Sequence, residues 1–114
     1  MTGGAGGIGQ VCAVALAGAG AQVIVGDLVP HRQDVAGSDG SSILSVVVDV
    51  SDETSVAHMV KEVEGRFGRL DILVNNAALL EGATRRPFHE LSVGEWDRMM
   101  AVNARGTFLC ARAA

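Results

Sequence analysis

The 114-residue chain contains no tyrosine and a single lysine, Lys61, and aromatic residues make up only 4% of it. Seven serines are present, and none of them follows Ser92. A tyrosine hydroxyl cannot serve as an acid or a base here, because the residue is absent. The composition therefore excludes, within this chain, any active site that combines a tyrosine with a nearby lysine.

Basic runs, membrane-length apolar runs and metal-ligand patterns are also missing. The formal net charge is -4 and the only adjacent basic pair is Arg85–Arg86, so no nucleic-acid or anionic membrane partner is expected. No apolar run has the length of a membrane span, and no signal peptide is visible. Cys12 and Cys110 fall in apolar helical stretches and match no metal-ligand spacing. We expect free thiols, no metal and a cytoplasmic location.

Glycine, by contrast, supplies five of the eight residues from Thr2 to Gly9, and an apolar helical pattern follows at once. Glycine adopts backbone angles that are closed to other residues. The first N–H groups of a helix have no partner within the helix and lie at its positive end. This combination predicts an anion site, for which a diphosphate is the usual ligand. A glycine-rich turn without a ligand is the alternative interpretation.

Helical and strand patterns alternate along the rest of the chain. The strands are apolar and rich in β-branched residues, as parallel strands covered on both faces are. Ser51 is expected to be the N-cap of the second helix, and Ser92 with Glu95 forms a capping box for the last one. The expected helices are 7–20, 51–67 and 92–114, and the expected strands are 22–27, 43–48 and 70–74. This order predicts one α/β domain with a doubly wound parallel sheet of the Rossmann type over residues 1–114.

The expected sheet is incomplete, because only Met1 and Thr2 precede the glycine-rich loop. In the strand order 3-2-1-4-5-6 the first strand is central. Without it, strands 22–27 and 43–48 can pair with each other, whereas 70–74 has no neighbour. Unpaired apolar edges favour aggregation. We therefore expect residues 1–114 to be a truncated Rossmann domain that is poorly stable as an isolated molecule.

An acidic residue after the first helix supports the interpretation of the glycine-rich loop as a nucleotide-binding site. Strand 22–27 ends in Asp27, about 20 residues beyond the glycines, where dinucleotide-binding folds place an acid to hold the ribose hydroxyls of the adenosine.

Four segments together resemble the short-chain dehydrogenase/reductase family. Thr2–Gly9 resembles the TGxxxGxG cofactor loop of the family, and Asp49–Val50 resembles the pair that touches the adenine ring. Asn75–Ala78 resembles the NNAG motif, with Ala78 in the place of the last glycine. Val102–Gly106 resembles the helix segment that carries the asparagine of the catalytic tetrad.

The resemblance implies a nicotinamide dinucleotide cofactor and a set of residues that bind it. The implied cofactor-binding residues are Thr2, Gly3, Gly6, Gly7, Ile8, Gly9, Asp27, Leu28, Asp49, Val50, Asn76, Ala77 and Ala78. The implied catalytic residue is Asn103, which would hold a water in a proton relay to a lysine. An exposed or locally satisfied asparagine is the alternative interpretation of Asn103.

The family's active site also needs a serine, a tyrosine and a lysine four residues after the tyrosine. Because these groups are absent, we expect the chain alone to be inactive and to lack the C-terminal catalytic half of the domain. The resemblance implies hydride transfer between the cofactor and a small alcohol/ketone pair in a full-length homo-oligomer (a dimer or tetramer). A non-catalytic dinucleotide-binding module and a non-functional truncated product are the alternatives.

The residue at position 27 bears on the choice of cofactor. A carboxylate can accept hydrogen bonds from both ribose hydroxyls, but it would face the additional phosphate of NADP(H). Many NADP-preferring relatives carry a basic residue just before the second glycine of the motif, and Gly6 stands there. Arg32 is close only in sequence. We therefore expect NAD(H) rather than NADP(H).

Overall fold

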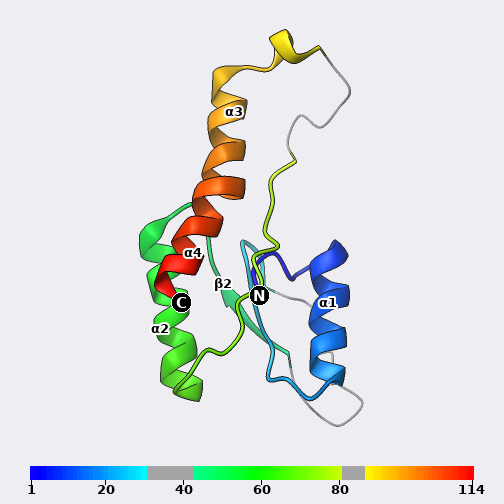
Figure 1. Cartoon of the computed structure of the whole chain (residues 1–114), viewed down its shortest axis with the longest axis vertical. Coiled ribbons are helices and arrows are strands. Elements are labelled where there is room, and N and C mark those ends of the chain that lie inside the picture. The colour runs from blue at the N-terminus through cyan, green and yellow to red at the C-terminus, as the bar shows by residue number, and fades with distance from the viewer. Residues whose placement is uncertain (31–42, 81–86) are drawn as a thin grey trace.

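A computed structural model describes residues 1–30, 43–80 and 87–114. One helix precedes the two strands along the chain, and the other described helices follow them (Figure 1). The elements are α1 (Gly7–Gly18), β1 (Ile24–Asp27), β2 (Leu44–Val47), α2 (Glu53–Phe67), the 3-10 helix η1 (Phe88–Glu90), α3 (Val93–Met100), the π-helix η2 (Ala101–Gly106) and α4 (Thr107–Ala113). The two strands pair in parallel, with Ile24 opposite Leu44 and Asp27 opposite Val47, which confirms the pairing expected from the sequence.

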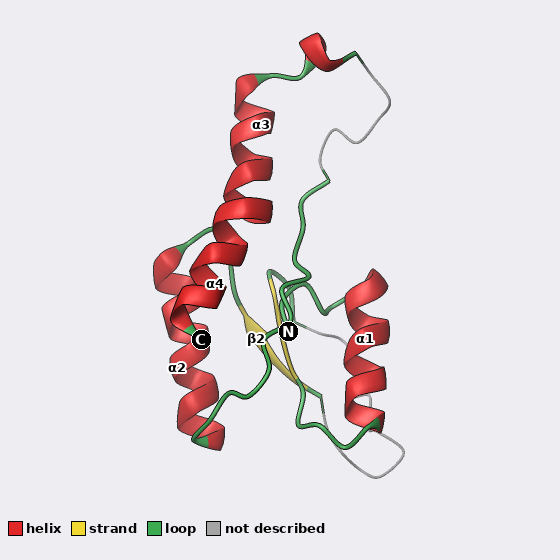
Figure 2. Cartoon of the chain, in the orientation of Figure 1, coloured by secondary structure: helices red, strands yellow, loops and turns green. Residues whose placement is uncertain are grey.

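Helices cover both faces of this small sheet. Figure 2 shows α1 on one side of the strands and α2 with α4 on the other. Side chains of a parallel strand alternate between the two faces, so each face has a core of its own. The α1 side buries Ala13, Ala17, Val23, Val25 and Ile43. The α2 and α4 side buries Val46, Val48, Val50, Val56, Met59, Val60, Leu109 and Cys110. This is the doubly wound arrangement, in part.

The strand expected at 70–74 is wrong, because no strand is assigned there. The segment lies beside Met1 and Thr2, and its link to them is a hydrogen bond of 2.9 Å from the Thr2 N–H to the Val74 carbonyl. Thr2 itself forms an isolated parallel bridge with Gly26. A strand is defined by its ladder, and two residues offer too few backbone groups to bond residues 70–74 along their length.

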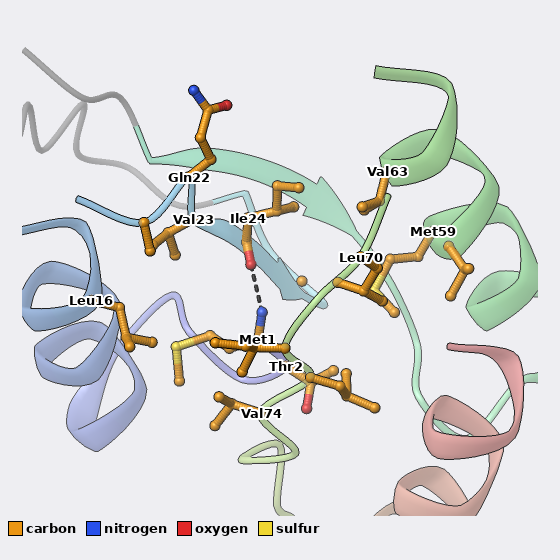
Figure 3. A pocket seen from close by; sticks show the side chains of 15 residues that line it. Met1, Thr2, Leu16, Gln22, Val23, Ile24, Met59, Val63, Leu70 and Val74 are labelled. Carbon is orange, nitrogen blue, oxygen red and sulfur yellow. Dashed lines mark hydrogen bonds between the residues drawn. The ribbon is translucent and has the colours of Figure 1, made fainter. Parts of the chain in front are cut away.

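An apolar cavity of about 100 Å³ lies beside Met1, between β1 and residues 70–74 (Figure 3). The Met1 ammonium donates a hydrogen bond of 2.6 Å to the Ile24 carbonyl, and burial lowers the pKa of this ammonium. Leu16, Met59 and Val63 extend into the space from the helices on either side. An incompletely filled space therefore lies along the side of β1 that faces Met1 and residues 70–74.

The ends of α2 correct one expectation and confirm another. The N-cap is Asp52 and not Ser51, since the Asp52 carboxylate accepts from the Thr54 N–H at 2.8 Å. Ser51 instead donates to Asp49. At the other end α2 stops at Phe67, as expected. Gly68 follows with φ 71°, and its N–H donates to the Glu64 carbonyl.

We expect Gly68→Ala to lower the free energy of unfolding by about 1 kcal/mol, because a Cβ disfavours this left-handed backbone. Urea denaturation measures it, and an unchanged midpoint would contradict it.

The last helix is not the continuous α-helix that its pattern predicts. The capping box of Ser92 and Glu95 is present at its start, but the π-helix η2 separates α3 from α4. In Figure 1, α3 extends away from the sheet while α4 lies beside α2. Among the described residues, none of these helices has the length and apolarity that crossing a bilayer demands.

Candidate functional site

A groove of about 490 Å³ lies at the carboxyl ends of β1 and β2. Every cofactor-binding residue expected from the sequence, except Thr2, lines this groove. The lining residues are Gly3, Gly6, Gly7, Ile8, Gly9, Gly26, Asp27, Leu28, Val48, Asp49, Val50, Asn76, Ala77, Ala78, Leu79, Leu80 and Val102. Ligands of open parallel sheets bind in this place, beyond the carboxyl ends of the strands.

The glycine-rich loop at one wall of the groove needs glycine for two different reasons. Gly3 and Gly7 have φ of 65° and 54°, in the left-handed region, which side chains with a Cβ disfavour. Gly9 instead lacks space, since a Cβ there would lie 2.1 Å from the Gly3 carbonyl oxygen. Gly6, the N-cap of α1, carries no capping side chain. The first N–H groups of α1 are therefore left for an anion.

Thr2 and Asn76 fix this loop to the segment on the opposite side. Thr2 is buried, with 2% of its surface exposed. Its hydroxyl accepts hydrogen bonds from the N–H groups of Asn76 and Ala77, both at 3.2 Å. The Asn76 amide donates to the carbonyls of Thr2 and Gly3 at 3.2 and 2.8 Å. Thr2 thus lies behind the groove and shapes it. Thr2 is not among the residues that line the groove, and the cofactor contact expected of it stays a prediction.

Asp27 connects β1 to the glycine-rich loop. Its carboxylate accepts from the N–H of Ala5 at 2.9 Å and from the N–H of Leu28 at 2.8 Å. Each oxygen accepts one backbone bond and keeps a further lone pair for another donor. Because the residue is half-buried at the groove, a hydroxyl-bearing ligand can reach the carboxylate.

Asp49 and Val50 form the wall that follows β2. Asp49 is exposed, and its Oδ1 accepts from the N–H and the hydroxyl of Ser51 at 2.9 and 2.7 Å. Val50 is buried, with 7% of its surface exposed. A carboxylate with a fixed orientation beside an apolar side chain suits a flat ring that carries hydrogen-bond donors at its edge.

Asn103 lies in the π-helix η2, outside the residues that line the groove. Its side-chain oxygen accepts from the Leu79 N–H at 2.7 Å, and its side-chain nitrogen donates to the Leu79 carbonyl at 3.0 Å. The side-chain amide is therefore satisfied by the backbone of Leu79, and the catalytic role that the resemblance implies for Asn103 stays a prediction. Its own carbonyl accepts from the Thr107 hydroxyl at 3.0 Å.

Five groove residues were not expected from the sequence, namely Gly26, Val48, Leu79, Leu80 and Val102. Gly26 and Val48 directly precede Asp27 and Asp49. Leu79 and Leu80 directly follow Ala78, and Val102 directly precedes Asn103, so proximity to the motifs is the signal that could have found them. Arg32 and the Arg85–Arg86 pair lie outside the described residues. Within residues 1–30, 43–80 and 87–114 no cluster of metal-ligating side chains occurs, and both cysteines are free thiols.

Comparisons with known proteins show which family the chain is similar to. A family model described as enoyl-(acyl carrier protein) reductase matches residues 3–114. A cis-4-hydroxycyclohexanecarboxylate dehydrogenase of Sinomonas cyclohexanicum is 40% identical over 98% of this chain and 45% of its own length. A short-chain dehydrogenase/reductase of Macrophomina phaseolina is 34% identical over all of this chain and 67% of its own.

Solved structures show the same likeness. A 3-ketoacyl-(acyl-carrier-protein) reductase from Brucella melitensis, crystallised with NADH, superposes with a TM-score of 0.87 at 36% identity. The superposition covers 97% of this chain and 45% of the reductase, so the chain spans less than half the length of that protein. From the match over residues 3–114 and the shared fold we conclude that the chain belongs to the short-chain dehydrogenase/reductase family.

Proposed function

We propose that this chain forms the dinucleotide-binding part of an NAD-dependent oxidoreductase, which transfers hydride between the cofactor and an alcohol/ketone pair in the full-length protein. One observation carries the proposal: residues from five separate segments of the chain line a single groove at the carboxyl ends of the strands. The reductase of Brucella melitensis that binds NADH supports it through its likeness to this chain.

The volume of the groove, about 490 Å³, and its lining support a dinucleotide as the ligand. In the proposed pose the diphosphate lies over the N–H groups that begin α1, and Asp27 accepts from the adenosine ribose. The adenine ring lies between Leu28 and Val50, with Asp49 at its edge. Ala77 and Ala78 face the second ribose, which directs the nicotinamide toward Leu79. The nicotinamide supplies hydride chemistry when bound, and this chain orients it.

The choice of NAD over NADP rests on charge. No lysine or arginine is among the described residues that line the groove. No basic side chain of this lining therefore compensates the repulsion between the Asp27 carboxylate and a 2′-phosphate. Two unit charges about 4 Å apart repel by roughly 4 kcal/mol at an effective dielectric constant of 20. A 2′-phosphate beside Asp27 would therefore be strongly disfavoured.

The direct test is calorimetric titration of the 114-residue chain with NAD+ and NADP+. We expect NAD+ to bind more tightly than NADP+. Asp27→Ala should lower the affinity for NAD+ and raise that for NADP+, so that the ratio of the two affinities changes by about a thousandfold. Asp97→Ala, on α3, is the matched control and leaves the ratio unchanged. No binding of either dinucleotide would refute the proposed function, and an unchanged ratio in Asp27→Ala would refute the role of Asp27.

The remaining proposals concern the full-length protein. Without a tyrosine, this chain would bind the cofactor and not turn over a substrate. Large apolar side chains are exposed on α3 and α4, among them Trp96, Met100 and Phe108, which supports assembly as a homo-oligomer through this face. The two free thiols support a reducing, cytoplasmic location.

A further inference from the structure

The π-helix η2 is bonded to two walls of the groove at once. Toward one wall, the Asn103 side chain holds both the N–H and the carbonyl of Leu79. Toward the other, Arg105 Nη2 donates to the Ser51 carbonyl at 2.8 Å. Val102, between these two contacts, lines the groove itself. One turn of helix therefore bridges segments that follow β2 and precede η1.

Gly106 brings the backbone of this turn directly against Val50. Gly106 is buried, and a Cβ on it would lie 2.8 Å from Val50 Cγ2 and 3.1 Å from the Val50 carbonyl oxygen. Both distances are shorter than carbon contacts allow without movement. The absence of a side chain at position 106 thus sets how closely the turn approaches the wall that holds Asp49 and Val50.

A chain of contacts leads from Arg105 to the Asp49 carboxylate. Arg105 fixes the Ser51 carbonyl, and the N–H and hydroxyl of the same Ser51 fix Asp49 Oδ1. Arg105 is exposed and does not line the groove, and its bond to the Ser51 carbonyl links it to the groove wall.

We propose that η2 is a positioning element of the dinucleotide site, in which Arg105 orients the adenine wall through Ser51 while Asn103 orients the opposite wall through Leu79. This inference rests on the proposed function, and it assigns Arg105 and Gly106 a task that the sequence motifs did not indicate. A π-turn contains one residue more than an α-turn, and such turns are frequent at functional sites. Here the turn carries the side chains that reach both walls.

The test compares two arginines of the same helical segment. Arg112 on α4 pairs with Glu53 at the start of α2, only two residues from Ser51, and lies over the Phe108 ring. Neither Glu53 nor Phe108 lines the groove. Arg105→Met and Arg112→Met are titrated by NMR with 5′-AMP and with nicotinamide mononucleotide as separate probes. We expect Arg105→Met to lower the affinity for 5′-AMP about fivefold and to leave the affinity for nicotinamide mononucleotide unchanged. Arg105→Lys restores part of the affinity, and Arg112→Met changes neither.

We expect the opposite result for Asn103→Ala. The affinity for nicotinamide mononucleotide falls about fivefold, while the affinity for 5′-AMP is unchanged. Equal weakening of both probes by Arg105→Met, or the same loss in Arg112→Met, would overturn the inference, because either result indicates a general loss of structure.

Amide hydrogen exchange without any ligand separates this inference from the proposed function. We expect faster exchange at Ser51 and Asp52 in Arg105→Met and at Leu79 in Asn103→Ala, with no change at these amides in Arg112→Met. If neither probe nor NAD+ binds the wild-type chain, the proposed function fails. If they bind and exchange at Ser51 is the same in Arg105→Met as in the wild type, the positioning role of Arg105 fails while the function stands.

Discussion

Replacing Gly9 by alanine is expected to weaken dinucleotide binding about a hundredfold. A Cβ at position 9 would lie 2.1 Å from the Gly3 carbonyl oxygen and 2.7 Å from Asn76 Nδ2. These are atoms of the very network that closes the loop, since Asn76 Nδ2 donates to the Gly3 carbonyl. The methyl group must push the loop and the Asn76 segment apart, and overpacking of this kind costs about 3 kcal/mol.

Titration with NAD+ measures this effect as an affinity loss of about a hundredfold. Gly18→Ala is the matched control, because a Cβ there meets no heavy atom within 4 Å. It exchanges a helical glycine for a better helix former, so we expect unchanged NAD+ affinity and a slightly higher melting temperature. A Gly9→Ala chain that binds NAD+ within threefold of wild type would contradict the close approach of the loop to Asn76.

Thr2→Val is expected to destabilise the fold more than any exposed substitution. Valine has nearly the same shape, but it cannot accept from the N–H groups of Asn76 and Ala77. Leaving a buried donor without its partner costs about 1–3 kcal/mol per group. With two donors affected and Thr2 only 2% exposed, we expect a loss of about 3 kcal/mol in the free energy of unfolding.

Urea denaturation of Thr2→Val, Thr2→Ser and Thr54→Val distinguishes the hydroxyl from the methyl group. Thr2→Ser keeps the hydroxyl acceptor, so it should lower the free energy of unfolding less than Thr2→Val does. Thr54 is exposed on α2, and its substitution should change the free energy of unfolding by less than about 0.5 kcal/mol. Equal denaturation midpoints for Thr2→Val and wild type would show that the two N–H groups are satisfied by other partners.

The local elements were predictable because their causes lie close together in the sequence. Apolar residues at helical spacing placed Val56, Val60 and Val63 on the buried face of α2, and a left-handed Gly68 ends it. The capping box of α3 needs only Ser92 and Glu95. The glycine-rich loop and Asp27 likewise carry their chemistry in their own residues.

Other features depend on partners that a linear pattern does not show. Residues 70–74 are apolar enough for a strand, yet a strand also needs a neighbour along its length, and Met1 with Thr2 provides one bond. Asn103 and Leu79 are 24 positions apart, and Arg105 and Ser51 are 54 positions apart. Neither pair has a spacing that predicts contact.

The sequence by itself determined the order of α1, β1, β2 and α2, the glycine-rich loop and the acid that ends β1, because backbone propensity and side-chain chemistry are local. Only the tertiary structure decided that Thr2 supports the groove from behind, that the last helix contains a π-turn, and that this turn reaches both walls. These outcomes arise from packing and hydrogen bonds between distant segments, which form only when the chain is folded.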